Sequence, residues 1–390
     1  MTIVVDRDQE FLLAVRRIAD EVAAPNADDV DRNARFPVET IDALRTKRAL
    51  SSLIPAELGG GGVSLEAVAA ACFELGRRCG ASAMVFAMHQ IQIATIARHV
   101  SGSPWFEAYL REVVTDQRLV ASVTSEIGTG GDLGKSIAAV TPINGERASF
   151  EKQAPTVSYG AYADDLLTTL RRGPDAEAGD QVAVLTQRGQ FQLEQKGTWD
   201  VMGMRGTCSP GYVVRAEFPV EQVLPTPFAT VATESMVPIS HILWSHLWLG
   251  IATDAFDRAR AFVKASAKAR PDQLPPTAAR LSQLMSELSL LRAEVHTGLR
   301  EFVEADAGNR EKLSTMATIL RFNSLKIAAS EQAPVVCRGA MSVCGIVGYR
   351  NDTPFSVGRH LRDTMSACLM VANDRIHQTN ASLLLIAKDV

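Results

Sequence analysis

The first third of the chain has a helical pattern of apolar and polar residues. From residue 9 to residue 22 the apolar side chains recur at spacings of three and four, so they form one stripe on a helix. Residues 63–75 and 81–100 repeat this pattern, and the four glycines at 59–62 form a turn before them. We therefore expect a helical N-terminal domain at residues 1–117.

The pattern changes near Arg118. Short runs rich in β-branched residues, such as LVASVT, QVAVLTQ and GYVVRAEFPV, alternate with turn segments such as RRGPDAEAGD. Runs and turns of this kind are typical of a small antiparallel β-domain, which we place at residues 118–228.

A helical period returns after Met236 and continues to the end of the chain. Four long stretches with short connections predict a four-helix-bundle domain at residues 229–390. The four stretches are residues 242–264, 278–305, 315–337 and 363–387. The expected fold class is therefore α+β and mostly α.

Composition limits the function classes. A chain of 390 residues that is 46% hydrophobic and 22% charged is globular and has room for two or three domains. The net charge of -4 and the lack of a Lys/Arg block disfavour a nucleic-acid partner. No stretch reaches the roughly 18 apolar residues of a membrane span. The six cysteines have no CxxC spacing and the seven histidines form no cluster, so we expect reduced thiols, no metal and a cytoplasmic location.

Five segments, in order along nearly the whole chain, resemble motifs of the acyl-CoA dehydrogenase superfamily. WDVMGMRGTCS at 199–209 is the most similar, because it has the family's Trp followed by Gly-Met-Arg-Gly-Thr. VTSEIGTGGDL at 123–133 resembles the family's Thr-Glu-Pro-x-Ala-Gly-Ser-Asp loop. The others are IPAELGGGGVS at 54–64, FEKQAPTVSYGAYADDLL at 150–167 and LRDTM at 361–365. The resemblance implies a middle antiparallel β-barrel between helical domains, and a homodimer or homotetramer.

The resemblance also implies FAD as the cofactor. Independently of it, the glycines at 128, 130 and 131 leave backbone N–H groups uncovered, so the loop can approach a flavin edge or a phosphate. Arg205 in the GMRGT motif is expected to pair with a carboxylate such as Glu126. The implied cofactor-binding residues are Thr124, Ser125, Gly130, Gly131, Thr156 and Ser158.

The family's catalytic glutamate is missing. Dehydrogenation of a thioester needs a base at Cα, and members carry this glutamate either nine residues after the Arg of LRDTM or ten before a Gly-Leu-Ala turn. Here these positions are Val371 and Ser240. Two replacements are candidates for the catalytic base: His241, beside the vacant position, and Asp374, almost one helical turn after Val371. Each also has a purely structural alternative, as a core histidine or a helix-terminal contact.

A second departure concerns the segments with which family members bind the flavin's adenosine and pyrophosphate across the dimer. The region 263–276 lacks the Arg-x-x-Phe-Gly pattern, and region 340–352 has Met341 where Gln is expected. Lys264, Lys268 and Arg270 are candidate stand-ins, and solvated surface charges are the alternative.

Three functions remain open. The first is FAD-dependent dehydrogenation of an unusual acyl thioester on coenzyme A or an acyl carrier protein, with an electron-transfer flavoprotein or oxygen as acceptor. The second is a flavin monooxygenase or oxidase of the same fold, which needs no Cα base; His241 would then steer a phenolic or amine substrate. The third is a non-catalytic partner subunit. The family resemblance favours the first.

Overall fold

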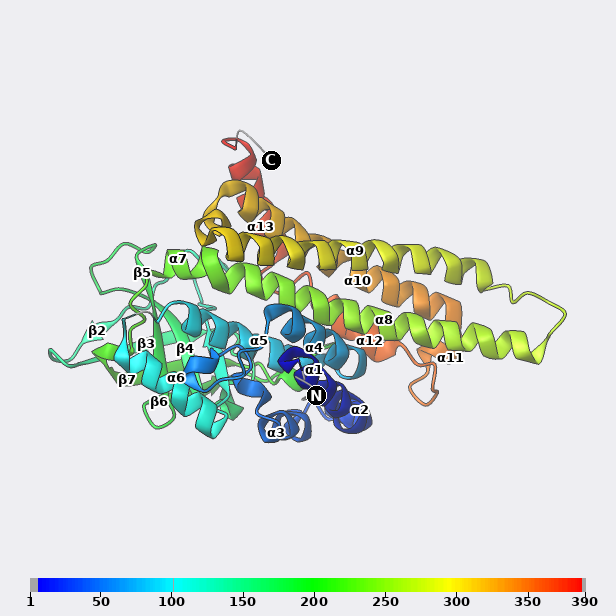
Figure 1. The fold of residues 1–390 in the computed structure, drawn as a ribbon, viewed down its shortest axis with the longest axis horizontal. Coiled ribbons are helices and arrows are strands. Elements are labelled where there is room, and N and C mark those ends of the chain that lie inside the picture. Colours follow the sequence, from blue (N-terminus) through cyan, green and yellow to red (C-terminus); the bar gives the residue numbers. More distant parts are fainter. Residues whose placement is uncertain (1–5, 101, 388–390) are drawn as a thin grey trace, which may run out of the picture.

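The computed structural model describes residues 6–100 and 102–387. The N-terminal part is helical, as expected, and packs beneath the long C-terminal helices (Figure 1). Its helices are α1 (Arg7–Ile18), α2 (Ala24–Arg32), α3 (Val38–Thr46), α4 (Leu65–Arg78), α5 (Gly80–Arg98) and α6 (Pro104–Asp116). The Ser64 side chain caps α4 by accepting a hydrogen bond from the Ala67 amide at 3.1 Å.

Helix α5 lies at the centre of the molecule. Nearly every residue from Gly80 to Ile96 is buried, which fits a helix that is apolar on all sides. It packs against both α4 and the first bundle helix, α8 (Val237–Ala269). Glycines bring the α4 and α8 backbones together, because a Cβ at Gly76 would overlap the Leu247 carbonyl and one at Gly250 would overlap that of Phe73.

The middle part forms two sheets. One has the order β1 (Val120–Val123), β4 (Asp165–Arg171), β5 (Gln181–Gln187). The other has the order β2 (Thr141–Pro142), β3 (Arg147–Ala154), β7 (Gly211–Pro219), β6 (Phe191–Lys196).

The expected antiparallel barrel is corrected on two points. The strands form two separate sheets rather than a closed barrel, and β1 pairs with β4 in parallel, with Val120 opposite Asp165. The physical reason lies in the path of the chain. It leaves β1 for the second sheet and returns through residues 155–164, so β4 enters the first sheet in the direction of β1.

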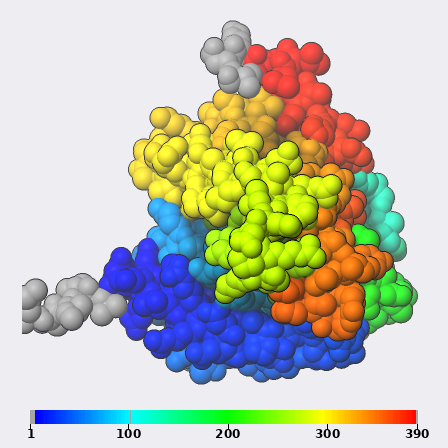
Figure 2. Space-filling view, turned by 90° about the vertical axis from the view of Figure 1, so that its right-hand side faces the viewer, coloured from blue at the N-terminus to red at the C-terminus, as the bar shows by residue number. Residues whose placement is uncertain are grey.

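Three long helices form the C-terminal bundle: α8, α9 (Ala278–Gly308) and α10 (Met316–Cys344) (Figure 1). The short helices α7 (Phe228–Val231) and α11 (Ile346–Tyr349) flank them. Figure 2 looks along the bundle and shows the N-terminal helices in blue packed below its yellow and orange helices, with the red C-terminal segment above.

The expectation of one continuous helix at 363–387 is wrong. The chain forms α12 (Gly358–Met365), a turn at 366–372, and then α13 (Asn373–Leu384). Within the turn Val371 has a φ of 46°, which no right-handed helix contains. A contact with another helix stabilises this break in the helix. Buried Asn373 accepts a hydrogen bond from Lys326 Nζ of α10 at 2.6 Å.

The division at residues 117 and 228 stays a prediction of domain boundaries. No helix in the described part of the chain is both long enough and apolar enough to span a membrane.

Candidate functional site

A cavity of about 1170 Å³ lies where the middle part meets the helices. Its wall comes from α5, the loops after β1 and β3, the segment 199–209, the start of α8 and the chain from Arg362 to Ser382. Of the predicted cofactor-binding residues, Thr124, Ser125, Gly131, Thr156 and Ser158 lie on this wall.

Hydroxyl groups line the side of the cavity formed by the β-strand loops. Ser125 Oγ donates to the Thr156 carbonyl at 2.7 Å, and Ser209 Oγ donates to Ser158 Oγ at 2.9 Å. Thr207 Oγ1 lies 2.8 Å from Ser209 Oγ and extends the row. Thr207 and Ser209 were not among the predicted site residues, although they belong to the WDVMGMRGTCS motif that signalled the family.

A buried ion pair holds the glycine loop. Glu126 accepts hydrogen bonds from the Ala138 amide at 2.6 Å and the Ile137 amide at 3.1 Å, and lies 3.6 Å from Lys152 Nζ. Burial lowers the pKa of Lys152 to about 8, against the pull of Glu126. The carboxylate of Glu126 is thus fully used in fixing the loop.

Arg205 pairs with a carboxylate, as predicted, but the carboxylate is Asp200 at 3.3 Å and not Glu126. The Arg205 guanidinium also donates to the Asp31 carbonyl at 2.9 Å and the Val201 carbonyl at 2.7 Å. Glu126 already has a buried partner in Lys152, so Arg205 joins the GMRGT segment to the N-terminal helices rather than to the glycine loop.

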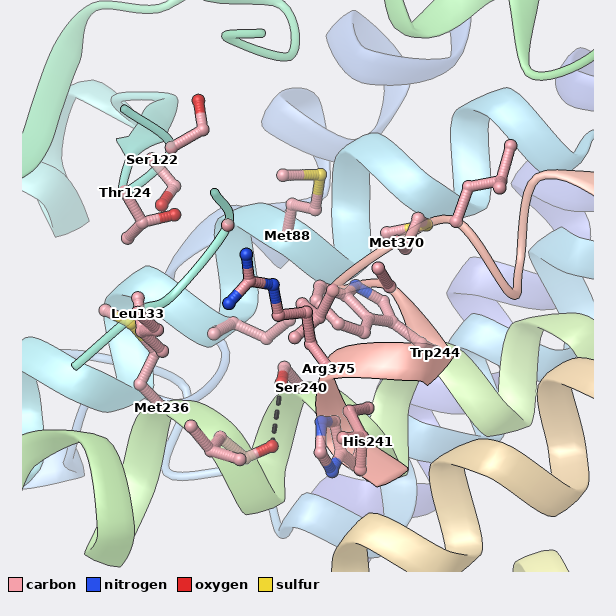
Figure 3. Close-up of a pocket in the computed structure, with 18 of the residues that line it drawn as sticks. Met88, Ser122, Thr124, Leu133, Met236, Ser240, His241, Trp244, Met370 and Arg375 are labelled. Carbon is pink, nitrogen blue, oxygen red and sulfur yellow. Dashed lines mark hydrogen bonds between the residues drawn. The ribbon is translucent and has the colours of Figure 1, made fainter. Parts of the chain in front are cut away.

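The opposite side of the cavity is apolar. Met88, Met236 and Trp244 line it, and Figure 3 shows them around the space beneath the Thr124 loop. Phe228 and Phe322 extend the apolar wall. Thioether and aromatic side chains exclude water and suit a flat apolar ligand.

Both positions of the family's glutamate face this cavity without a carboxylate. Val371 and Ser240 line the wall, and the Ser240 hydroxyl donates to the Val237 carbonyl at 2.7 Å (Figure 3). Among the described residues on the wall, Asp132 is the only acid. It accepts from the Gly134 amide at 2.9 Å and lies 3.5 Å from Lys135 Nζ, so it closes a surface turn.

His241 lies on the cavity wall and is 1% exposed. Its Nδ1 is 3.1 Å from the Phe322 carbonyl oxygen, which only accepts, so Nδ1 carries the proton and Nε2 remains an acceptor. Burial, with a smaller contribution from the charge of Lys326, lowers the pKa of His241 to about 3. The ring is therefore neutral and a weak base near pH 7.

The remaining two predicted site residues lie off the cavity wall. Asp374 is exposed in the first turn of α13, and Gly130 lies one residue before the wall residue Gly131. Arg375, which the sequence analysis did not single out, lines the cavity beside Gly130.

Four buried polar atoms on the wall have no hydrogen-bond partner within the described residues. They are Gln92 Oε1, Gln181 Oε1, Trp199 Nε1 and Trp244 Nε1. Buried polar groups are rarely left unpaired in folded proteins. Together with the hydroxyl row and the glycine loop, they fit a large polar ring system such as a flavin.

Comparisons with known proteins bear on the family and the fold. The family model for the acyl-CoA dehydrogenase N-terminal domain matches residues 6–112. Cyclohex-1-ene-1-carbonyl-CoA dehydrogenase of Syntrophus aciditrophicus (strain SB) is 25% identical over 386 residues, covering 97% of this chain and 90% of the relative. Residues 6–112 thus match the acyl-CoA dehydrogenase N-terminal domain, and the chain is similar along most of its length to proteins named acyl-CoA dehydrogenases.

Other relatives carry oxygenase names. The probable FMNH2-dependent monooxygenase SfnC of Pseudomonas putida is 24% identical over 386 residues, covering 94% of this chain and 93% of the relative. The crystal structure of FMN-bound TdsC from Paenibacillus sp. A11-2 has a TM-score of 0.82 at 21% identity, covering 96% of this chain and 97% of that one. The latter likeness shows the shared fold alone. Proteins similar to this chain thus carry dehydrogenase names as well as monooxygenase names.

Proposed function

We propose that this protein is a monooxygenase that acts with reduced flavin on a flat, apolar substrate bearing a hydroxyl or amine. The observation that supports the proposal is a cavity with a flavin-compatible wall and no base. Both glutamate positions are occupied by Val371 and Ser240, and the only acid on the described wall, Asp132, is tied into a turn.

Dehydrogenation depends on removing a Cα proton, and a well-placed base accelerates this step by roughly 10²–10⁴-fold. His241, with a pKa of about 3, would be a poor acceptor for that proton. Insertion of an oxygen atom into the substrate does not require a base that removes a Cα proton. Reduced flavin, when bound, supplies two electrons to oxygen, so that one oxygen atom enters the substrate and the other leaves as water.

The chain's own residues have three tasks in this proposal. The hydroxyls of Ser125, Ser158 and Ser209 bind the polar edge of the cofactor. The apolar wall around Met88 and Trp244 keeps water away from the reacting atoms. His241 Nε2 accepts a hydrogen bond from the hydroxyl or amine of the substrate and so orients it.

The second candidate function is FAD-dependent dehydrogenation of an acyl thioester, with a displaced base and an electron-transfer flavoprotein as acceptor. The likeness to cyclohex-1-ene-1-carbonyl-CoA dehydrogenase along 97% of this chain favours it. It needs a proton acceptor at the cavity, and His241 is the candidate from the sequence.

The test couples the purified protein to a separate flavin reductase, NADH, FMN and isotopically labelled oxygen, with a panel of phenols, aromatic amines and acyl thioesters. We expect a product that carries one labelled oxygen atom and forms only when reductase and oxygen are both present. Desaturated thioester without labelled oxygen would instead support the second candidate.

A pair of variants tests the role given to His241. His241→Phe should raise the KM for the hydroxyl- or amine-bearing substrate by about tenfold, because one hydrogen bond to it is lost. His246→Phe is the matched control, since His246 is a buried histidine on the same helix that does not line the cavity. Equal effects of both variants would remove His241 from substrate binding.

A further inference from the structure

Arg375 projects from α13 into the cavity and has an unused guanidinium. Figure 3 shows it reaching toward the loop that bears Thr124 and Leu133. Within residues 6–100 and 102–387 its side chain makes no hydrogen bond and no ion pair. The other arginine on the wall, Arg362, differs, because it is bound to Asp31 and to the Met202 carbonyl at 2.9 Å.

The position of Arg375 is fixed by its neighbours. Buried Asn373, two residues earlier, accepts from Lys326 Nζ at 2.6 Å and donates to Ser330 Oγ at 3.1 Å. Ile376, one residue later, is 5% exposed and packs inward. The start of α13 is thus anchored on α10, and Arg375 is presented to the cavity from a rigid element.

The glycine loop faces this guanidinium. A Cβ at Gly130 would lie 2.2 Å from Arg375 Nη2, so the end of the guanidinium lies directly against the glycine loop. Gly130 and Gly131 have φ angles of 61° and 82°, and no protein group in the described residues accepts from their amides. Successive free amides in such turns form a concave site for an anion.

We propose that Arg375 and the amides of Gly130 and Gly131 bind the phosphate on the ribityl chain of the flavin. This inference rests on the flavin site of the proposed function. A phosphate monoester carries nearly two negative charges at neutral pH, and the guanidinium fork can bind two of its oxygens at once. No acidic side chain in the described structure lies within ion-pair distance of Arg375, so the bound anion has no competitor.

This assignment also accounts for a departure in the sequence. Region 263–276 lacks the Arg-x-x-Phe-Gly pattern, and Met341 stands at the Gln position, with which the family is expected to bind a flavin pyrophosphate from a second subunit. Arg375 supplies a positive charge from within the same chain, close to the ring-binding hydroxyls. FMN ends at its single phosphate. A protein that binds FMN therefore needs no contacts to a second phosphate or to an adenosine.

The test compares riboflavin with FMN, which differ only in the phosphate. The protein freed of flavin is titrated with each by fluorescence, for the wild type, Arg375→Gln, Arg375→Lys and the control Arg280→Gln, an exposed arginine of α9. In Arg375→Gln, FMN affinity should fall about tenfold to a hundredfold while riboflavin affinity stays unchanged. Arg375→Lys should keep part of the preference for FMN over riboflavin, because lysine retains the positive charge but cannot bind two phosphate oxygens at once. Arg280→Gln should match the wild type.

Some outcomes would overturn only the inference about Arg375, and one would overturn the proposed function. Equal losses for riboflavin and FMN, or no loss for either, would overturn the inference alone. Coenzyme A is titrated in the same way. If Arg375→Gln leaves FMN binding unchanged but weakens coenzyme A binding, Arg375 binds a phosphate of the substrate, and the inference is overturned. Failure of the wild type to bind either flavin would overturn the proposed function itself. A circular dichroism spectrum identical to that of the wild type excludes misfolding of the variants.

Discussion

The two candidate functions differ in whether His241 can act as a base. Its protonation state near neutral pH can be tested directly. Its pKa of about 3 follows first from burial, since the ring is 1% exposed, and second from the charge of Lys326. With this pKa, about 1% of the ring is protonated at pH 5, whereas a histidine with the ordinary pKa of about 6.5 would be about 97% protonated.

The same shift makes stability depend on pH. The pKa of His241 is lower in the folded chain than in the unfolded chain. The contribution of neutral His241 to the free energy of unfolding is therefore complete above about pH 6.5 and is lost as the pH falls toward 3. At pH 5 the loss from this one residue is about 2 kcal/mol. His241→Phe should remove that part of the acid sensitivity, while Ser240→Ala, a neighbouring change without a titrating group, should not.

The assay is NMR of protein labelled at its histidine rings. The signal that disappears in His241→Phe identifies His241, and its chemical shift is followed in the wild type from about pH 8 to pH 5. We expect no titration in this range. A midpoint between about pH 6 and pH 7 would refute the reasoning and would return a competent base to the dehydrogenase hypothesis.

Three further predictions concern the framework of the site. Gly130→Ala should destabilise the loop by about 1–2 kcal/mol and weaken FMN binding, because φ is positive and the methyl group meets Arg375; denaturation and fluorescence titration measure the two effects. Val371→Gly should raise the free energy of unfolding by about 1 kcal/mol in urea denaturation, because a β-branched residue is strained at φ 46°. Asp254→Ala should cost about 1–3 kcal/mol, seen as a lower Tm, because it leaves buried His360 without the hydrogen-bond acceptor that lies 2.7 Å from its Nε2.

Local patterns were enough to predict much of this molecule. The order of helices, strands and helices is confirmed, because apolar periodicity reflects which face of each element is buried. The Gly-rich and Ser/Thr segments were also informative. Thr124, Ser125, Gly131, Thr156 and Ser158 lie on one cavity wall, since short polar residues near glycines leave room for a ligand. Their part in flavin binding stays a prediction.

Features set by distant contacts could not be predicted. No glycine or proline marks the turn at 366–372, which depends on Asn373 being bonded to Lys326. Asp374 was placed near Val371 by assuming a continuous helix, and the turn removes that relationship. The same turn places Arg375 on the cavity wall, and the sequence alone does not predict that position. The pairing of β1 with β4 is likewise a matter of chain path rather than local propensity.

The most direct test of the central claim is anaerobic. The flavin-loaded protein is mixed with a panel of acyl thioesters while its visible spectrum is recorded. A cavity without a base predicts that the oxidised flavin keeps its yellow absorbance with every thioester and loses it only when a reductase and NADH are added. Rapid bleaching by any thioester alone would contradict the account and would establish dehydrogenation.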